Sequence, residues 1–415
     1  MTASLPSSPA DDAAVEGRFP ELTGLRAVAA TAIVGTHAAF WTHSDGDTPL
    51  GRALTRLDVG VAVFFVLSGF LLSRPFLRAA ARGTATPAVR PYLWRRALRV
   101  FPAYWLAVVA AMVLLPANSG ATAGDWLRHL LLLPVYAGGG LAPGLGQTWS
   151  LAPEVAFYAV LPLLAAGLCR LSPRPAAAGE GWRPTGVLAG IAAMTVAAQL
   201  WLVWTWSGDS PTGVTALWLP GYLGWFGAGM ALAVVGTAAP GWAPARLVRD
   251  LGAGLGTCWS AATVLFYLAC GPLGGPLGLQ VPSPAAAVSK NLLYLGVALL
   301  LVLPLVVDTS GVGPVRRLLA CGPMTWLGEV SYGLFLFHLV VLLGLVEVLG
   351  SSPLRGSLVI VGTLTWVGGV LVAAVVHRTV ERPVARWRNV AGPRRRSAVP
   401  TSAAAMPATA STPDS

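Results

Sequence analysis

Residues 22–41 read LTGLRAVAATAIVGTHAAFW, a run of mainly apolar residues that ends in Phe and Trp. About twenty such residues form a helix long enough to cross the hydrocarbon core of a bilayer. Two ionisable residues, Arg26 and His37, interrupt the run. Ionisable side chains inside a spanning helix are energetically costly, so each is a candidate functional residue. The run therefore predicts a transmembrane helix that carries part of a functional site.

The composition extends this prediction to the whole chain. Hydrophobic residues make up 55% of the 415 positions, and charged residues make up only 11%, against roughly 25% in soluble domains. The net charge is +11, but the cations are scattered between apolar runs, which argues against nucleic-acid binding. The four cysteines show no metal-ligand spacing, so no metal site is predicted.

Ten ranges are apolar and long enough to predict an all-α polytopic membrane protein with about ten transmembrane helices. The ranges are 22–43, 57–77, 97–117, 149–169, 186–206, 216–236, 251–271, 291–307, 324–349 and 357–377. The apolar stretch Trp126–Tyr136 is too short to cross and is predicted to be interfacial or re-entrant.

The distribution of positive charge predicts that both termini are cytoplasmic. With ten spans and a cytoplasmic N-terminus, all but five of the 28 Lys and Arg residues fall on the cytoplasmic side. The positive-inside rule favours such a distribution. The five exceptions are Arg52, Arg56, Arg128, Lys290 and Arg355. Loops 207–215 and 272–289 should face outward, whereas loops 170–185 and 308–323 and the Arg394–Arg396 run should face inward.

The chain is predicted to contain one folded domain between two tails. Residues 1–17 are rich in Ser, Pro, Ala and Asp, and residues 389–415 are first Arg-rich and then rich in Ser, Ala, Pro and Thr. Both compositions are typical of disordered segments. Residues 18–388 are predicted to form the transmembrane domain.

Arg26 and His37 are predicted to share one face of the first helix. Eleven residues correspond to about 1100° of rotation, close to three full turns, and to about 16 Å along the axis. Arg26 then lies in the cytoplasmic third of the membrane and His37 in the outer third. Position alone leaves a second interpretation open, in which Arg26 extends to lipid headgroups and His37 forms an interfacial hydrogen bond.

Three arginines crowd the cytoplasmic start of the third span, at Arg95, Arg96 and Arg99. Residues at i, i+3 and i, i+4 are neighbours on a helix, so three guanidinium groups there can bind phosphates through paired hydrogen bonds. Anchoring to anionic lipids fits the same pattern.

Glu154 lies near the outer end of the fourth span, at a depth similar to that of His37. A His37–Glu154 pair is therefore possible, in which the acid orients and charge-stabilises the imidazole. His338 and His377 lie on later apolar helices and are predicted to be structural.

Six segments in one order together resemble a known family. They are LTGLRAVAATAIVGTHA (22–38), VFFVLSGFLL (63–72), RRALRVFPAYW (95–105), TWSLAPEVAFY (148–158), LGEVSYGLFLFH (327–338) and ERP (381–383). The order resembles the membrane-bound acyltransferase family 3, which includes the O-acyltransferases of bacterial surface glycans and macrolides.

The resemblance implies roles for individual residues. Arg26 and His37 match the family's first-helix Arg/His pair, and His37 matches its proposed catalytic histidine. Arg96 and Arg99 match the RxxR motif associated with the acyl donor, and Glu154 matches the acid of the Trp-Ser-Leu-x-x-Glu segment. Three positions differ from many members: Ala152 and Pro153 replace Ser-Val, and Ala62 replaces a polar residue.

The predicted activity is transfer of an acyl group from acyl-coenzyme A, with acetyl-coenzyme A as the expected donor, to a hydroxyl of a glycan or a glycosylated metabolite. Arg95, Arg96 and Arg99 would bind the donor phosphates on the cytoplasmic side. His37 would act as general base or accept the acyl group transiently. Its depth favours an acceptor that arrives from outside, and a cytoplasmic acceptor stays open.

The alternative function is that of a transporter with His37 and Glu154 as a proton relay. A single lysine among 28 basic residues, with abundant Ala and Gly, is typical of a GC-rich bacterial genome. The expected location is therefore the bacterial plasma membrane. The sequence does not determine the oligomeric state.

Overall fold

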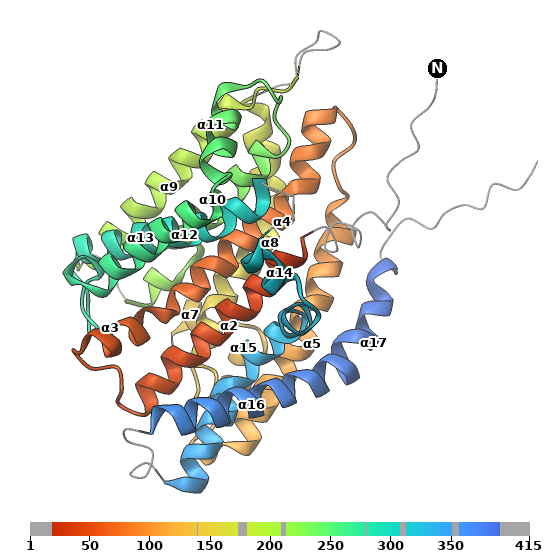
Figure 1. The fold of residues 1–415 in the computed structure, drawn as a ribbon. Helices are drawn as coiled ribbons and strands as arrows, with labels where there is room; N and C mark the ends of the chain where they lie inside the picture. The colour runs from red at the N-terminus through yellow and green to blue at the C-terminus, as the bar shows by residue number, and fades with distance from the viewer. Residues whose placement is uncertain are drawn as a thin grey trace, which may run out of the picture.

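The computed structural model describes residues 19–138, 140–172, 181–208, 213–278, 280–307, 313–350 and 357–390. Every regular element in these residues is a helix, which confirms the predicted all-α class (Figure 1). Each of the ten predicted ranges overlaps one helix, and nine of these helices have 16 residues or more. The exception is range 216–236, which is divided among two short 3-10 helices and a helix of 13 residues. The helices are α2 (Pro20–Trp41), α4 (Gly60–Arg82), α5 (Val89–Leu114), α8 (Leu151–Arg170), α9 (Thr185–Trp206), α10 (Leu223–Val235), α12 (Leu255–Cys270), α13 (Pro284–Val307), α15 (Gly322–Leu349) and α16 (Leu358–Val376).

Within the described residues, seven helical segments are long and apolar enough to cross a membrane. An eighth is added if α11 (Ala243–Gly252) and α12, which meet at 83°, form one bent span. These segments confirm a multi-pass membrane architecture. Two predicted spans fall outside this set, because α2 carries Arg26 and His37 and α10 has only 13 residues. The count of ten and the cytoplasmic termini stay predictions.

Short helical elements connect the long helices. They are α3 (Pro49–Thr55), η1 (Arg56–Val59), η2 (Pro116–Asn118), α6 (Ala123–Leu130), α7 (Pro134–Ala137), η3 (Gly146–Ser150), η4 (Gly213–Leu217), η5 (Leu219–Tyr222), η6 (Pro272–Gly274), α14 (Pro314–Ala320), the π-helix η7 (His377–Glu381), α17 (Arg382–Ala385) and η8 (Arg386–Asn389). The predicted non-spanning stretch Trp126–Tyr136 is divided between α6 and α7, so the structure confirms that it is not one spanning helix.

Several predictions concern residues outside the described ranges. They include all of the 1–17 tail, residues 391–415 of the second tail with the Arg394–Arg396 run, and parts of three predicted loops at 173–180, 209–212 and 308–312. The sidedness of these loops stays a prediction.

The centre of the bundle contains α2, α4, α10 and α15. Helices α4 and α10 cross at two glycines. A Cβ atom on Gly69 would lie 2.1 Å from the carbonyl oxygen of Phe226, and one on Gly229 would lie 2.0 Å from that of Val66. Small residues allow such close helix contact in membranes. The glycine of the LSGF segment is therefore needed for packing.

The outer helices expose apolar side chains. Val196 and Leu200 on α9 are 59% and 64% exposed, and Val359 and Leu371 on α16 are 79% and 63% exposed. The two helices lie on opposite sides of the bundle in Figure 1. Large apolar surfaces of this kind are unfavourable in water. They match the hydrocarbon surroundings predicted from the composition.

Candidate active site

His37 lies in the last third of α2, and this helix is continuous from Arg26 to His37. Both side chains are half-buried. The Nδ1 atom of His37 lies 3.0 Å from the carbonyl oxygen of Ile33 and 3.0 Å from Nε2 of His338 on α15. The two ring centroids are 5.0 Å apart. The fold therefore joins two histidines that are 301 residues apart in the chain.

The hydrogen bonds of His338 determine the protonation pattern of this pair. Its Nδ1 lies 2.7 Å from the carbonyl oxygen of Phe335 and 3.2 Å from that of Leu334. Carbonyl oxygens only accept hydrogen bonds, so Nδ1 carries the proton, and Nε2 of the neutral ring is an acceptor.

The same reasoning applies to His37. Its Nδ1 faces two acceptors, the Ile33 carbonyl and the His338 Nε2, so it must be the donor. A neutral imidazole with a proton on Nδ1 has its lone pair on Nε2. The pair thus presents His37 Nε2 as a base, and His338 and Ile33 hold the ring in that tautomer.

Close packing of α15 against α2 and α16 places His338 at this position. A Cβ atom on Gly328 would lie 1.9 Å from the carbonyl oxygen of Thr23, and one on Gly369 would lie 3.7 Å from the Cα of His338. His338 is fully buried. The prediction that His338 has only a structural role missed this contact. The sequence feature that could have indicated a functional role for His338 is the family-like segment LGEVSYGLFLFH, which ends at this residue.

Glu154 lies in the first turn of α8, where the helix dipole favours a carboxylate. Its Oε1 accepts hydrogen bonds from the Ser68 hydroxyl at 2.7 Å and the Tyr158 hydroxyl at 2.6 Å. Ser68 belongs to the LSGF segment of α4. The TWSLAPE and LSGF segments therefore meet through Glu154.

The predicted His37–Glu154 pair is not among the hydrogen bonds of the described residues. Glu154 bonds to side chains of α4 and α8, whereas His37 bonds to α15. The rotation of α8 directs the carboxylate toward α4, and sequence depth alone does not specify that rotation. In this structure His338 holds the position beside His37 that the sequence assigned to Glu154.

The predicted donor arginines lie in the second and third turns of α5. Arg99 Nη1 lies 2.8 Å from Glu381 Oε2, and its guanidinium lies 5.6 Å from the centre of the Tyr332 ring. The same Glu381 oxygen lies 3.0 Å from His377 Nδ1. The closing ERP segment thus supplies a counter-charge to the RxxR segment. Sequence reasoning assigned no role to Glu381.

Two polar atoms of this cluster are buried without a hydrogen-bond partner among the described residues. They are Arg96 Nε and Glu381 Oε1. Buried polar atoms are normally paired with protein, water or a ligand. Arg96 therefore retains an unused donor at the position predicted for the acyl donor. Arg95 is half-buried on the same helix.

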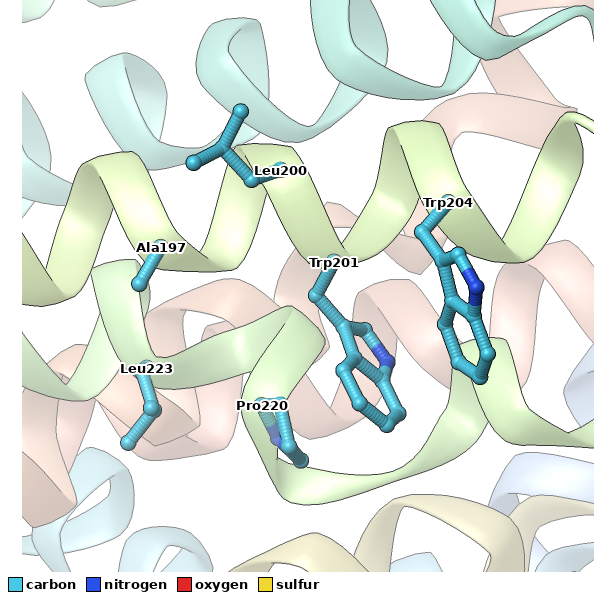
Figure 2. Close-up of a pocket in the computed structure, with 6 residues that line it drawn as sticks. All are labelled: Ala197, Leu200, Trp201, Trp204, Pro220 and Leu223. Carbon is cyan, nitrogen blue, oxygen red and sulfur yellow. The ribbon is translucent and has the colours of Figure 1, made fainter.

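A hollow of about 370 Å³ lies elsewhere, between α9 and the start of α10 (Figure 2). Six apolar side chains line it, including Trp201 and Trp204. None of them can take part in acid–base chemistry, so this hollow is not a candidate active site. Among the described residues, no group of three or more His, Cys, Asp or Glu side chains could hold a metal ion.

Comparison with known proteins identifies the class. The model of the acyltransferase domain family, acyltransferase family 3, matches residues 19–377. The chain belongs to this family. The match includes both histidines of the pair, the RxxR arginines and Glu154.

Individual relatives match shorter parts of the chain than the family model does. The chain is 32% identical over 161 residues to the acyltransferase MdmB of Streptomyces mycarofaciens, covering 35% of this chain and 39% of that protein. It is 28% identical over 163 residues to nodulation protein 10 of Rhizobium leguminosarum bv. viciae, covering 34% and 42%. It is 35% identical over 116 residues to the exopolysaccharide production protein ExoZ of Rhizobium meliloti, covering 26% and 35%. The chain thus spans about two fifths of the length of these curated relatives. No solved structure matches it significantly.

Proposed function

We propose that this protein is an integral membrane O-acyltransferase that transfers an acyl group from acyl-coenzyme A to a hydroxyl group. The observation that carries the proposal is the histidine pair, which leaves the lone pair of His37 Nε2 available as a base. Family membership supports the reaction class. Acetyl is the expected acyl group, and the expected location is the bacterial plasma membrane.

The reaction is an attack of the acceptor oxygen on the thioester carbonyl. His37 Nε2 removes the hydroxyl proton, a carbon–oxygen bond forms, and the carbon–sulfur bond breaks. The proton then passes from His37 to the leaving thiolate. The imidazolium formed during attack keeps its Nδ1–H bonded to His338 Nε2 and the Ile33 carbonyl. Transient acylation of His37 is the alternative sequence of steps.

The donor phosphates are proposed to bind at the start of α5. Arg95, Arg96 and Arg99 provide three guanidinium groups there, and Glu381 orients Arg99. Arginine binds phosphate oxygens through paired hydrogen bonds. The unused Arg96 Nε supports this placement. Arg26 is half-buried on α2 and shares a helix face with His37. It is proposed to belong to the catalytic site together with His37.

The proposed acceptor is a hydroxyl of a glycan or a glycosylated small molecule. One relative is named for exopolysaccharide production, which supports the glycan class. The predicted proton-relay transporter required His37 and Glu154 to be linked. Their separate hydrogen-bond partners give that function no support.

The decisive test is thiol release from acetyl-coenzyme A by purified protein, with a soluble sugar as the hydroxyl acceptor. Wild-type protein should release thiol in step with sugar acylation. His37→Ala should reduce the rate by about 10²–10⁴-fold, the usual contribution of a positioned general base. Expression and membrane insertion should not change. Near-normal turnover in this variant would show that His37 is not the base.

A further inference from the structure

Three of the five cations predicted to lie on the outer side of the membrane, Arg52, Arg56 and Lys290, occupy neighbouring elements of the fold. Arg56 Nε donates to the carbonyl oxygen of Ala269 at 3.0 Å, and Arg52 Nη1 donates to that of Cys270 at 3.4 Å. Both carbonyls belong to the last turn of α12, so the two arginines cap the end of that helix. Lys290, on α13, has a different kind of partner.

Lys290 forms an ion pair with Asp58 of η1. Its Nζ lies 2.9 Å from Asp58 Oδ2 and 5.0 Å from the centre of the Tyr294 ring, one turn further along α13. The Tyr294 hydroxyl donates to the other carboxylate oxygen, Oδ1. Tyr294 is only 1% exposed and holds the carboxylate in place, whereas the side chains of Lys290 and Asp58 are 34% and 38% exposed. Ion pairs this exposed contribute little to stability, so stability alone does not explain the pair.

The ion pair presents a hydrogen-bond donor and an acceptor side by side. A carboxylate oxygen can accept more than one hydrogen bond, and each Asp58 oxygen accepts one from the described residues. The Lys290 ammonium group has three N–H donors, one of which Asp58 uses. A hydroxyl group donates and accepts at once, so it can bond to both residues. Since Asp58 would repel an anion and Lys290 would repel a cation, the arrangement favours a neutral compound with several hydroxyl groups.

The element that carries Asp58 packs beside the His37 face of α2. Gly60 follows η1 directly, and a Cβ atom on it would lie 2.5 Å from the carbonyl oxygen of Ala29 and 3.1 Å from Cγ1 of Ile33. Ile33 precedes His37 by one turn on the same face of α2. The charge of Asp58 also acts on His37 electrostatically. The ion pair therefore lies in the neighbourhood of the proposed base.

We propose that Asp58 and Lys290 bind an uncharged sugar of the acceptor through its hydroxyl groups and reject charged sugars. This inference rests on the proposed acyltransferase function, because it names the residues that hold the acceptor near His37. It adds a substrate class, the neutral glycan or glycoside, to the reaction. Neither residue belongs to the six family-like segments, so the sugar preference is a property of this chain.

Three glycosides that differ in one functional group test the proposal. They are methyl glucoside, methyl glucuronide, in which a carboxylate replaces the primary alcohol, and the matching amino sugar, in which an ammonium group replaces the primary hydroxyl. Binding to the full-length protein in nanodiscs of zwitterionic lipid is measured by saturation-transfer NMR, without an acyl donor. Wild-type protein should bind the neutral glucoside more strongly than either charged glycoside.

Two variants should shift this preference in opposite directions. Asp58→Asn leaves the lysine charge unbalanced and should shift the preference toward the glucuronide by about tenfold or more, as expected for one charge-assisted hydrogen bond. Lys290→Met leaves the carboxylate unbalanced and should shift the preference toward the amino sugar by a similar factor. A pair that only held α13 against η1 would affect the three glycosides equally. The matched control is Asp47→Asn, because Asp47 pairs with Arg52 on the same side of the fold but is 85% exposed; it should shift no preference.

The binding measurement is independent of turnover. Absence of saturable glucoside binding to wild-type protein, a wild-type preference for a charged glycoside, or unchanged preferences in both variants would overturn the proposal. Opposite preference shifts in a protein that releases no thiol from acetyl-coenzyme A would retain the sugar site and refute the proposed acyl transfer. Sugar acylation with the same glycoside preference in wild type, Asp58→Asn and Lys290→Met would refute the sugar site alone.

Discussion

His338 offers the sharpest test of the histidine pair, because its predicted effect follows from one hydrogen bond. His338→Phe removes the Nε2 acceptor of the His37 Nδ1 proton and retains an aromatic ring in a fully buried site. The His37 ring keeps its bond to the Ile33 carbonyl and therefore its tautomer. The variant should lose stabilisation of the imidazolium that forms during proton transfer.

The size of the loss follows from the change of charge. A hydrogen bond to a charged group contributes about 1.5–3 kcal/mol, which corresponds to about a 10- to 150-fold fall in kcat. This is smaller than the effect expected for His37→Ala, since the base itself remains. The donor KM should stay unchanged, because the hydrogen bonds and ring contacts of His338 within the described residues involve none of the arginines proposed to bind the donor.

The assay is thiol release under saturating acetyl-coenzyme A, with the melting temperature measured in the same detergent. His338→Gln is the matched variant, because its side-chain oxygen can accept a hydrogen bond near the former Nε2 position. It should recover part of the lost kcat. A wild-type kcat in His338→Phe would refute the reasoning. Equal losses in both variants, each with a lowered melting temperature, would assign His338 to packing.

Three further predictions concern the donor site, the packing and the topology. Arg99→Ala should raise the donor KM about tenfold or more, and Arg99→Lys should restore part of the affinity; unchanged KM values would assign Arg99 to structure. Gly69→Ala should lower the melting temperature, because overpacking costs about 1–3 kcal/mol where a new Cβ would lie 2.1 Å from the Phe226 carbonyl oxygen. In a cysteine-free background, Ser283→Cys should react with an impermeant thiol reagent in intact cells, and Gly311→Cys only after permeabilisation. The reverse pattern would mean that a crossing was miscounted.

The helices themselves were predictable because their signal is local. Runs of about twenty apolar residues indicate spanning helices without reference to the rest of the chain, and nine of the ten predicted ranges overlap a helix of 16 residues or more. The stretch Trp126–Tyr136 was excluded because it is too short to cross, and the structure divides it between two short helices. The cost of ionisable groups in lipid likewise singled out Arg26, His37 and Glu154 from the sequence.

The contacts of those residues were not predictable in the same way. Position along each helix predicted that His37 and Glu154 lie at similar depths in the membrane. It did not specify the direction in which each side chain points. The structure directs Glu154 to Ser68 and His37 to His338. His338 itself lies in an apolar run, where sequence reasoning favours a structural role.

The sequence by itself thus determined the membrane class, the helix ranges and the ionisable residues that the bilayer penalises, since each depends on composition or on spacing along one helix. Only the tertiary structure decided which helices touch. It joins His37 to His338 across 301 residues and Arg99 to Glu381 across 282 residues. The physical reason is that lipid is as apolar as the helices, so hydrophobicity does not select their partners. Close packing at glycines and hydrogen bonds between polar groups make that selection, and both depend on the rotation of every helix in the bundle.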